Sequence, residues 1–214
     1  MILSKITDVV CYKIKLVMFK IKWRKLNVHN FTTTNSLFPI DLVKVGNYSY
    51  GPIQIYNYGE INSGLEIGNL CSIAQDVKFI LGGNHYTNRL FTYPINPMIS
   101  GFGCGGYSKG KIIIGHDCWI GIGTILLSGI SIGNGCVIAA GSVVTKSFPP
   151  YSIIGGSPAK LLRMRFSEDI IVLLEKNQFI YNLPREKYLK CLEQIEEILL
   201  FENIQPILDI YLKD

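Results

Sequence analysis

An aliphatic residue that returns every six positions is the feature of this sequence that most limits how the chain can fold. Between residues 114 and 144 it stands in strict phase, at Ile114, Ile120, Leu126, Ile132, Ile138 and Val144. A period of six matches neither the 3.6-residue period of an amphipathic helix nor the alternation of a long strand. It favours short strands separated by tight turns, so that each repeat supplies one face of a coil and points its aliphatic side chain inward. The same unit occurs earlier, at Val45 and Ile67.

A second inward position follows four places after each aliphatic residue, and three cysteines, Cys71, Cys118 and Cys136, fall on it. We expect them to be small buried hydrophobes without chemistry. The six cysteines of the chain form no CxxC pair and no regular framework. This usage favours free thiols in a reducing compartment and predicts a cytoplasmic protein.

The repeat phase divides the chain into three parts. Phe79 and Ile114 are 35 positions apart, which is not a multiple of six, so residues 84–111 are predicted to form an inserted loop, rich in Gly, Pro, Asn and aromatic residues. Long loops on rigid scaffolds are usually functional. Residues 43–166 form the predicted repeat domain and residues 167–214 a helical extension. In that extension Ser167, with Asp169, is predicted to cap one helix, and residues 185–201 show helical periodicity.

Residues 1–42 are predicted to be a basic, amphipathic segment. Residues 1–26 hold seven basic side chains against Asp8 alone, a balance of +6, whereas the remaining 14 basic and 15 acidic side chains give −1. An apolar stripe follows one side of a helix over residues 3–23, at Leu3, Ile6, Val10, Ile14, Val17 and Ile21. The segment fits either a membrane interface or a helix packed on protein with its lysines in water. The chain contains neither a nucleic-acid-binding signature nor an apolar run long enough to span a membrane, and it lacks a secretory pattern.

Several motifs resemble the xenobiotic acetyltransferase branch of the hexapeptide-repeat acyltransferases. They are GGNH at 82–85, Thr92-Tyr93-Pro94, IGHDCWIG at 114–121, and GGSPAK at 155–160. The resemblance is strong over residues 43–166 and weak in the C-terminal helices, where the family's paired tryptophans are absent near residues 178–181. It implies an all-β fold class: a left-handed parallel β-helix with three repeats per turn, an inserted active-site loop and terminal helices. It also implies a homotrimer.

The resemblance further implies acetyl transfer from acetyl-CoA to a hydroxyl, without a metal. His85, where the rigid coil meets the polar loop, is the predicted general base, a role worth ~10²–10⁴-fold in rate. The family pattern places cofactor contacts at Trp119, Ala140, Thr145, Lys146, Lys160 and Arg163. The predicted acceptor-side residues are Asn84, Tyr56 and Tyr93. His116 is expected to face solvent without a catalytic role, and Cys104 is a rival nucleophile that has no activating partner nearby in the sequence.

The acceptor is left open between two classes. The basic start and residues 23–31 resemble the polysaccharide-associated relatives, and this resemblance favours a hydroxyl of a surface-polysaccharide sugar. The enzyme would then be peripheral at the inner face of the membrane through residues 1–26. The alternative is an antibiotic hydroxyl, as in chloramphenicol or streptogramin acetylation. From other classes, a non-catalytic trimeric scaffold remains open, whereas a metal site like that of γ-class carbonic anhydrases would need His29, His85 and His116 together.

Overall fold

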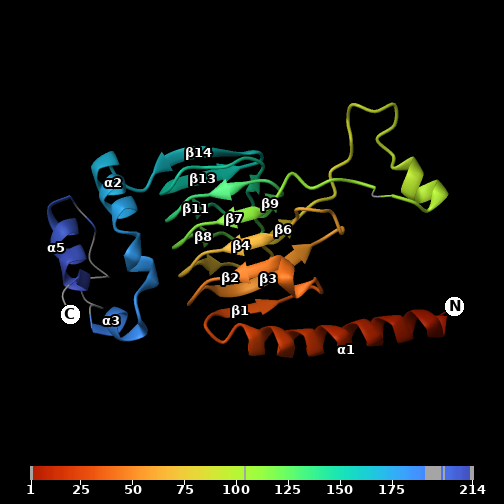
Figure 1. Cartoon of the computed structure of the whole chain (residues 1–214), viewed down its shortest axis with the longest axis horizontal. Helices are drawn as coiled ribbons and strands as arrows, with labels where there is room; N and C mark the ends of the chain where they lie inside the picture. The colour runs from red at the N-terminus through yellow and green to blue at the C-terminus, as the bar shows by residue number, and fades with distance from the viewer. Residues whose placement is uncertain (1, 104, 191–198, 200, 213–214) are drawn as a thin grey trace.

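The chain folds into a three-sided coil of parallel strands with helices at both ends (Figure 1). The computed structural model describes residues 2–103, 105–190, 199 and 201–212. One face of the coil contains β2 (Val43–Val45), β4 (Leu65–Ile67), β7 (Ile112–Ile114) and β10 (Ser131–Ile132). The second contains β5 (Ser72–Ile73), β8 (Trp119–Ile120), β11 (Val137–Ile138) and β13 (Ser152–Gly156). The third contains β6 (Lys78–Ile80), β9 (Ile125–Leu127) and β12 (Val143–Val144).

The strand register confirms the six-residue repeat. Ile114 pairs with Ile132, 18 residues later, so one turn of the coil comprises three repeats. All six aliphatic residues from Ile114 to Val144 are buried, as are the side chains four places after each. At the start of the coil, β3 (Tyr50–Tyr56) pairs with β1 (Phe31–Thr34) and spans the second and third faces. The all-β class therefore describes the coil and not the terminal helices. The left-handed sense of the coil stays a prediction.

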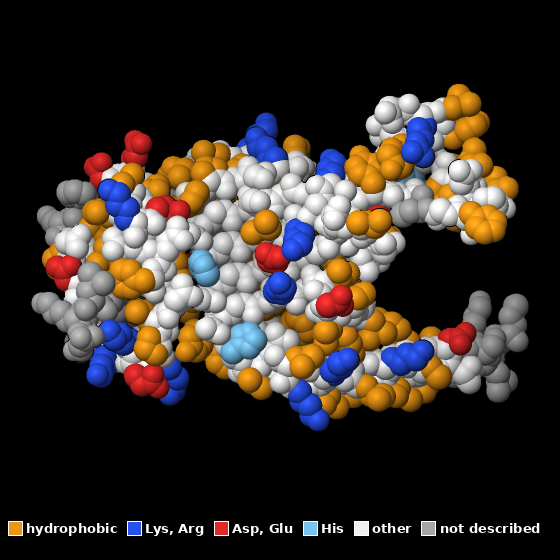
Figure 2. Space-filling model, in the orientation of Figure 1, with side chains coloured by type: hydrophobic (Ala, Val, Ile, Leu, Met, Phe, Trp, Pro, Cys, Tyr) orange, Lys and Arg blue, Asp and Glu red, His pale blue; other side chains and the backbone are white. Residues whose placement is uncertain are grey.

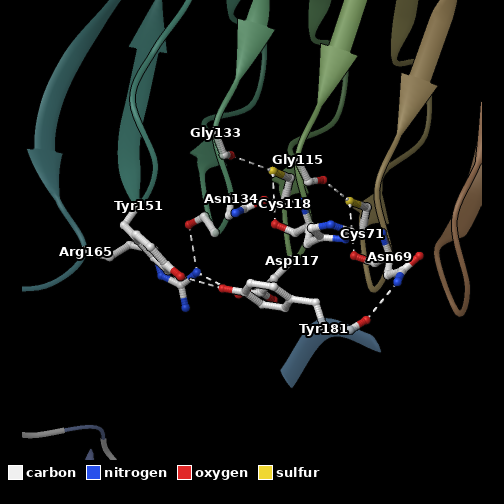
Figure 3. A network of polar contacts seen from close by, with 12 residues as sticks. Asn69, Cys71, Gly115, Asp117, Cys118, Gly133, Asn134, Tyr151, Arg165 and Tyr181 are labelled. Atoms are coloured by element: carbon white, nitrogen blue, oxygen red, sulfur yellow. Dashed lines mark hydrogen bonds and ion pairs between the residues drawn. The ribbon is translucent and has the colours of Figure 1, made fainter. Parts of the chain in front are cut away.

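Cys71, Cys118 and Cys136 are buried, as predicted, and they occupy the same position on successive turns of the coil. The thiols of Cys71 and Cys118 each donate to a glycine carbonyl on the next turn, at 3.1 and 3.2 Å (Figure 3). Cys136 donates to Pro149 O in the same way, at 3.2 Å, and burial raises the pKa of this thiol. The three thiols thus satisfy backbone carbonyls, and the thiol of Cys136 stays protonated.

The N-terminal helix α1 (Ile2–Leu26) lies across the first turn of the coil and extends beyond it (Figure 1). Its contact side includes Phe19 and Trp23, which both pack on Phe38; Trp23 is 1% exposed, and its Nε1–H donates to Thr32 Oγ1 at 3.1 Å. The helix is as predicted, but the described part of the predicted apolar stripe faces away from the coil. Within the described residues, no helix is long and apolar enough to cross a bilayer.

Beyond β13 the chain turns back as the antiparallel β14 (Ala159–Met164) and then becomes helical. The helical elements are α2 (Glu168–Lys176), η3 (Gln178–Asn182), α3 (Arg185–Lys190) and α5 (Phe201–Leu212). Ser167 occupies the N-cap position of α2, but its hydroxyl makes no capping hydrogen bond, so the predicted side-chain cap is wrong. The helix predicted over 185–201 is confirmed for residues 185–190, and residues 191–198 and 200 lie outside the described residues.

Candidate active site

The inserted loop leaves the coil at one corner, between β6 and β7, and its two ends are fastened together. Asn84 and Tyr107 exchange backbone hydrogen bonds of 3.1 and 2.9 Å in an antiparallel bridge. One step outside this bridge, Ser108 Oγ donates to Leu81 O at 2.6 Å. The loop projects well away from the coil (Figure 1). A residue next to the bridge is therefore held by the coil and accessible from the loop.

His85 is that residue, and its ring orientation is fixed. Its Nδ1 lies 2.7 Å from Thr92 O, and the side chain is exposed. A carbonyl oxygen only accepts, so Nδ1 must carry the proton in this contact. In the neutral ring, the lone pair is then left on Nε2. Among the described residues, no hydrogen-bond partner is found for Nε2, and this nitrogen belongs to an exposed side chain at the junction that the sequence singles out.

Asn84 secures the position of His85. Its Nδ2 donates to Tyr107 O at 3.0 Å and to Ser128 Oγ, just after β9, at 3.2 Å. These bonds join the loop base to the next turn of the coil. The sequence assigns Asn84 to the acceptor side, whereas its side-chain amide in the structure holds the loop.

Glu60 is a residue that the sequence analysis missed. Its carboxylate is buried, with 8% of the residue exposed, and Oε1 accepts the Gly83 N–H at 2.6 Å. No hydrogen-bond partner is found for Oε2 among the described residues. A Cβ on Gly82 would lie 2.2 Å from this oxygen, so a larger residue there would displace the buried carboxylate. No local pattern in the sequence links Glu60 to Gly83, because the two residues are 23 positions apart.

The two predicted acceptor-side tyrosines lie near this corner. Tyr56 ends β3 beside Ile80, and its backbone oxygen accepts the Leu81 N–H at 2.9 Å. Tyr93 is exposed and, with Tyr86 and Thr92, lines a hollow of ≈ 270 Å³ within the loop. The carbonyl that orients His85 therefore belongs to a residue that also borders this hollow.

The predicted cofactor residues fall into two groups. Thr145 and Lys146 are exposed at the corner that carries the loop base, because Lys146 comes 18 residues, one full turn, after Ser128. The other four lie elsewhere on the coil. Trp119 is exposed on β8, Ala140 follows β11, and Lys160 and Arg163 are exposed on β14. Thr145 and Lys146 thus lie one turn along the corner from the loop base that carries His85, and the other four predicted residues lie on other elements.

The other two histidines are bound into the scaffold. His29 Nε2 lies 2.9 Å from Val45 O. His116 Nδ1 accepts the Asn69 N–H at 2.9 Å, and its ring stacks on Tyr181 of η3 at 5.3 Å. Burial lowers the pKa of His116, while Glu175 opposes this effect. The expectation that His116 faces solvent is wrong, because η3 covers the outward side of this repeat.

A polar network at the same corner attaches η3 to the coil (Figure 3). Tyr151 and Tyr181 share a hydroxyl hydrogen bond of 2.6 Å, and Asn69 Nδ2 donates to Tyr181 O at 2.8 Å. Arg165 bridges Asp117 at 3.0 Å and Gly135 O at 2.7 Å. Burial raises the pKa of Tyr151 to about 12, so its hydroxyl stays protonated. This corner is structural.

The sequence also leaves two alternative chemistries open, a cysteine nucleophile and a metal site. Cys104, the rival nucleophile, lies outside the described residues. In the part of the chain that the structure describes, no three His, Cys, Asp or Glu side chains are arranged to hold a metal ion.

Comparison with known proteins agrees with the repeat coil. The sequence profile of the bacterial transferase hexapeptide family (six repeats) matches residues 111–146. A probable macrolide acetyltransferase of Lysinibacillus sphaericus is 40% identical over 149 residues, which cover 64% of this chain and 80% of that protein. The chain belongs to the hexapeptide-repeat acetyltransferases. It is accordingly an acyltransferase.

A further relative supports this membership, and a solved structure shares the fold. A chloramphenicol acetyltransferase of Morganella morganii is 36% identical over 164 residues, which cover 68% of this chain and 78% of the relative. Among solved structures, a hexapeptide-repeat containing acetyltransferase from Vibrio cholerae aligns with a TM-score of 0.51 at 21% identity, covering 68% of this chain and 78% of that one. The structural likeness concerns the fold alone.

Proposed function

We propose that this hexapeptide-repeat acetyltransferase transfers the acetyl group of acetyl-CoA to a hydroxyl of a small antibiotic-like molecule, with His85 as general base. The carrying observation is the His85 Nδ1 contact with Thr92 O, which leaves the Nε2 lone pair on the exposed side of a fastened loop base. A neutral hydroxyl is a poor nucleophile, so a positioned base is what this reaction requires of the protein.

In the proposed step, His85 Nε2 removes the hydroxyl proton while the hydroxyl oxygen bonds to the thioester carbonyl carbon. The resulting oxyanion is stabilised by hydrogen-bond donors aimed at it. When the intermediate collapses, the carbon–sulfur bond breaks and the imidazolium returns its proton to the coenzyme A thiolate. The products are the acetyl ester and free coenzyme A, and no covalent enzyme intermediate is required.

The acetyl-CoA site is proposed to lie between neighbouring coils of a homotrimer. Support comes from the separation of the predicted contacts, since Trp119 and Ala140 lie away from the corner that carries His85. The loop also exposes large apolar side chains, including Leu90, Ile99 and Phe102, which burial against another copy would cover. Light scattering tests this point: a trimeric mass is expected at micromolar concentration, and a monomeric mass would contradict it.

The acceptor class is proposed from the relatives. Their names, macrolide and chloramphenicol acetyltransferase, favour the antibiotic alternative over the polysaccharide acceptor preferred from the sequence. A sugar hydroxyl on a lipid carrier is the second candidate, because α1 exposes apolar and basic side chains that suit work at a membrane.

The deciding experiment measures release of coenzyme A thiol from acetyl-CoA with a panel of acceptors. Chloramphenicol, a macrolide and a streptogramin are compared with free sugars, using the wild-type chain and a His85→Asn variant. We expect acceptor-dependent, His85-dependent release with an antibiotic. Release with sugars alone would establish the second candidate. Absence of transfer to every acceptor by an acetyl-CoA-binding trimer would favour a non-catalytic scaffold.

A further inference from the structure

Helix α1 carries two apolar stripes on opposite sides, and only one is used by the coil. Ile14 and Ile21 are 55% and 54% exposed, whereas Trp23, two residues beyond Ile21, is 1% exposed. Two residues correspond to about 160° around an α-helix when measured the shorter way. Val10 and Val17 complete the outward stripe at three- and four-residue spacing.

Basic side chains border the outward stripe on both flanks. Lys13 and Lys20, seven residues apart, lie on one flank, and Lys15 and Lys22 lie on the other. All four are exposed, and Figure 2 shows Lys and Arg side chains interspersed with hydrophobic ones along α1. Such lysines can extend their charged ends past an apolar surface toward water or headgroups.

The helix is also fixed to the coil at its C-terminal end. Trp23 is buried, and Arg24 donates to Asn30 O at 2.7 Å and to Thr32 O at 3.0 Å. These contacts set which side of α1 faces outward. The two stripes therefore differ in their partners because of this docking and not because of their composition.

We propose that the outward stripe of α1 docks on the surface of an anionic lipid bilayer. The apolar residues Val10, Ile14, Val17 and Ile21 would enter the headgroup boundary, and the flanking lysines would meet lipid phosphates. Charge complementarity favours lipid over a second copy of this helix: residues 1–26 carry +6, so two stripes packed together would bring lysine rows against lysine rows.

The docking also fixes the orientation of the enzyme. Because α1 lies across the first turn of the coil, a bilayer on its outward side would face the N-terminal end of the stack (Figure 1). The active-site loop leaves the coil between β6 and β7, further along the stack than α1. It would therefore be separated from the bilayer by the first turns of the coil and by α1. This proposal does not depend on the identity of the acceptor or on catalysis.

Flotation of the full-length chain with vesicles tests the proposal. Vesicles of phosphatidylcholine mixed with phosphatidylglycerol are compared with phosphatidylcholine alone, at low and high salt. We expect binding to the anionic vesicles only, and weaker binding at high salt. Ile14→Ser with Ile21→Ser should lower the partition coefficient by at least about tenfold. Lys15→Glu should lower it by about tenfold.

Matched control variants lie on α2, where Val172 and Lys176 are exposed. Val172→Ser and Lys176→Glu should leave vesicle binding within about twofold of wild type, because they leave α1 unchanged. Surface changes of this kind also barely affect stability. The proposal is overturned if the wild-type chain fails to float at low salt, or if the stripe variants float as well as the controls. It is also overturned if the stripe variants change the mass in sedimentation, because the stripe then joins copies of the chain.

Discussion

The loop base around His85 and the corner of the coil beneath η3, around His116, each hold one imidazole ring through its Nδ1 atom. At the loop base, Nδ1 faces the carbonyl of Thr92, 2.7 Å away. At the covered corner, Nδ1 accepts the backbone N–H of Asn69 at 2.9 Å. The first contact requires a proton on Nδ1, and the second requires a lone pair there.

The difference shows how the backbone assigns a role to a side chain. His85 retains a lone pair on Nε2 at an exposed edge, whereas the only lone pair of neutral His116 is already engaged. Stacking on Tyr181 further withdraws the His116 ring from solvent. Both residues sit in motifs that resemble the family, and the backbone group that each Nδ1 faces, together with the exposure of the ring, separates a candidate base from a structural ring.

The largest expected effect separates these two histidines directly. His85→Asn should lower the rate of acetyl transfer by ~10²–10⁴-fold, because the proton acceptor is lost. The affinity for acetyl-CoA should stay the same, as His85 is not proposed to bind it. His116→Asn should keep most of the activity. Steady-state kinetics on both variants check this, and activity of His85→Asn within tenfold of wild type would refute the assignment.

The loop base should also depend on Glu60. Glu60→Ala leaves the Gly83 N–H without its partner and loosens the chain next to His85, so we expect kcat to fall by roughly 10–10²-fold. Glu60→Gln should restore much of this, because its amide oxygen can still accept. A purely structural role would instead lower Tm without changing kcat per folded enzyme, and comparing kcat with the melting curve distinguishes the two.

A smaller effect is expected for Lys146, which lies one turn along the coil from Ser128 at the loop base. Lys146→Ala should raise the KM for acetyl-CoA by roughly tenfold with little change in kcat, because a cation near a polyanionic ligand contributes to binding. Lys176→Ala on α2 is the matched control. An unchanged KM in Lys146→Ala would remove this residue from the cofactor site.

The smallest effect concerns the pH dependence of stability at the covered corner. Burial lowers the pKa of His116 below its ordinary value of 6.5, against the opposing charge of Glu175. The unfolded state then takes up a proton that the folded state does not, so stability is complete above pH 6.5 and declines as the pH falls through the lowered pKa. Thermal unfolding above and below this pH should show a weaker acid dependence in His116→Asn, and equal dependence would contradict the explanation.

The sequence predicts the positions of the repeat. Contacts that occur only once, between residues far apart in the chain, become visible only in the structure. The inward positions from Ile114 to Val144 were predictable because a six-residue period admits few folds. The place of His85 at the junction of coil and loop was predictable because the period breaks there, and its role as the base stays a prediction. Glu60 was not, since a carboxylate reaching Gly83 across 23 residues has no local pattern. The buried side of α1 was also missed, because the helix has two apolar stripes and composition does not say which one packs.

The different roles of His85 and His116 depend on which ring nitrogen carries the proton. Nitrogen NMR of the imidazole rings reports this directly. The chain has three histidines, so the spectrum is simple, and the His85→Asn and His116→Asn variants assign its signals. With both rings neutral, we predict that His85 carries its proton on Nδ1 and His116 on Nε2. An Nε2-protonated His85 would place the lone pair against the Thr92 carbonyl and contradict its assignment as the general base.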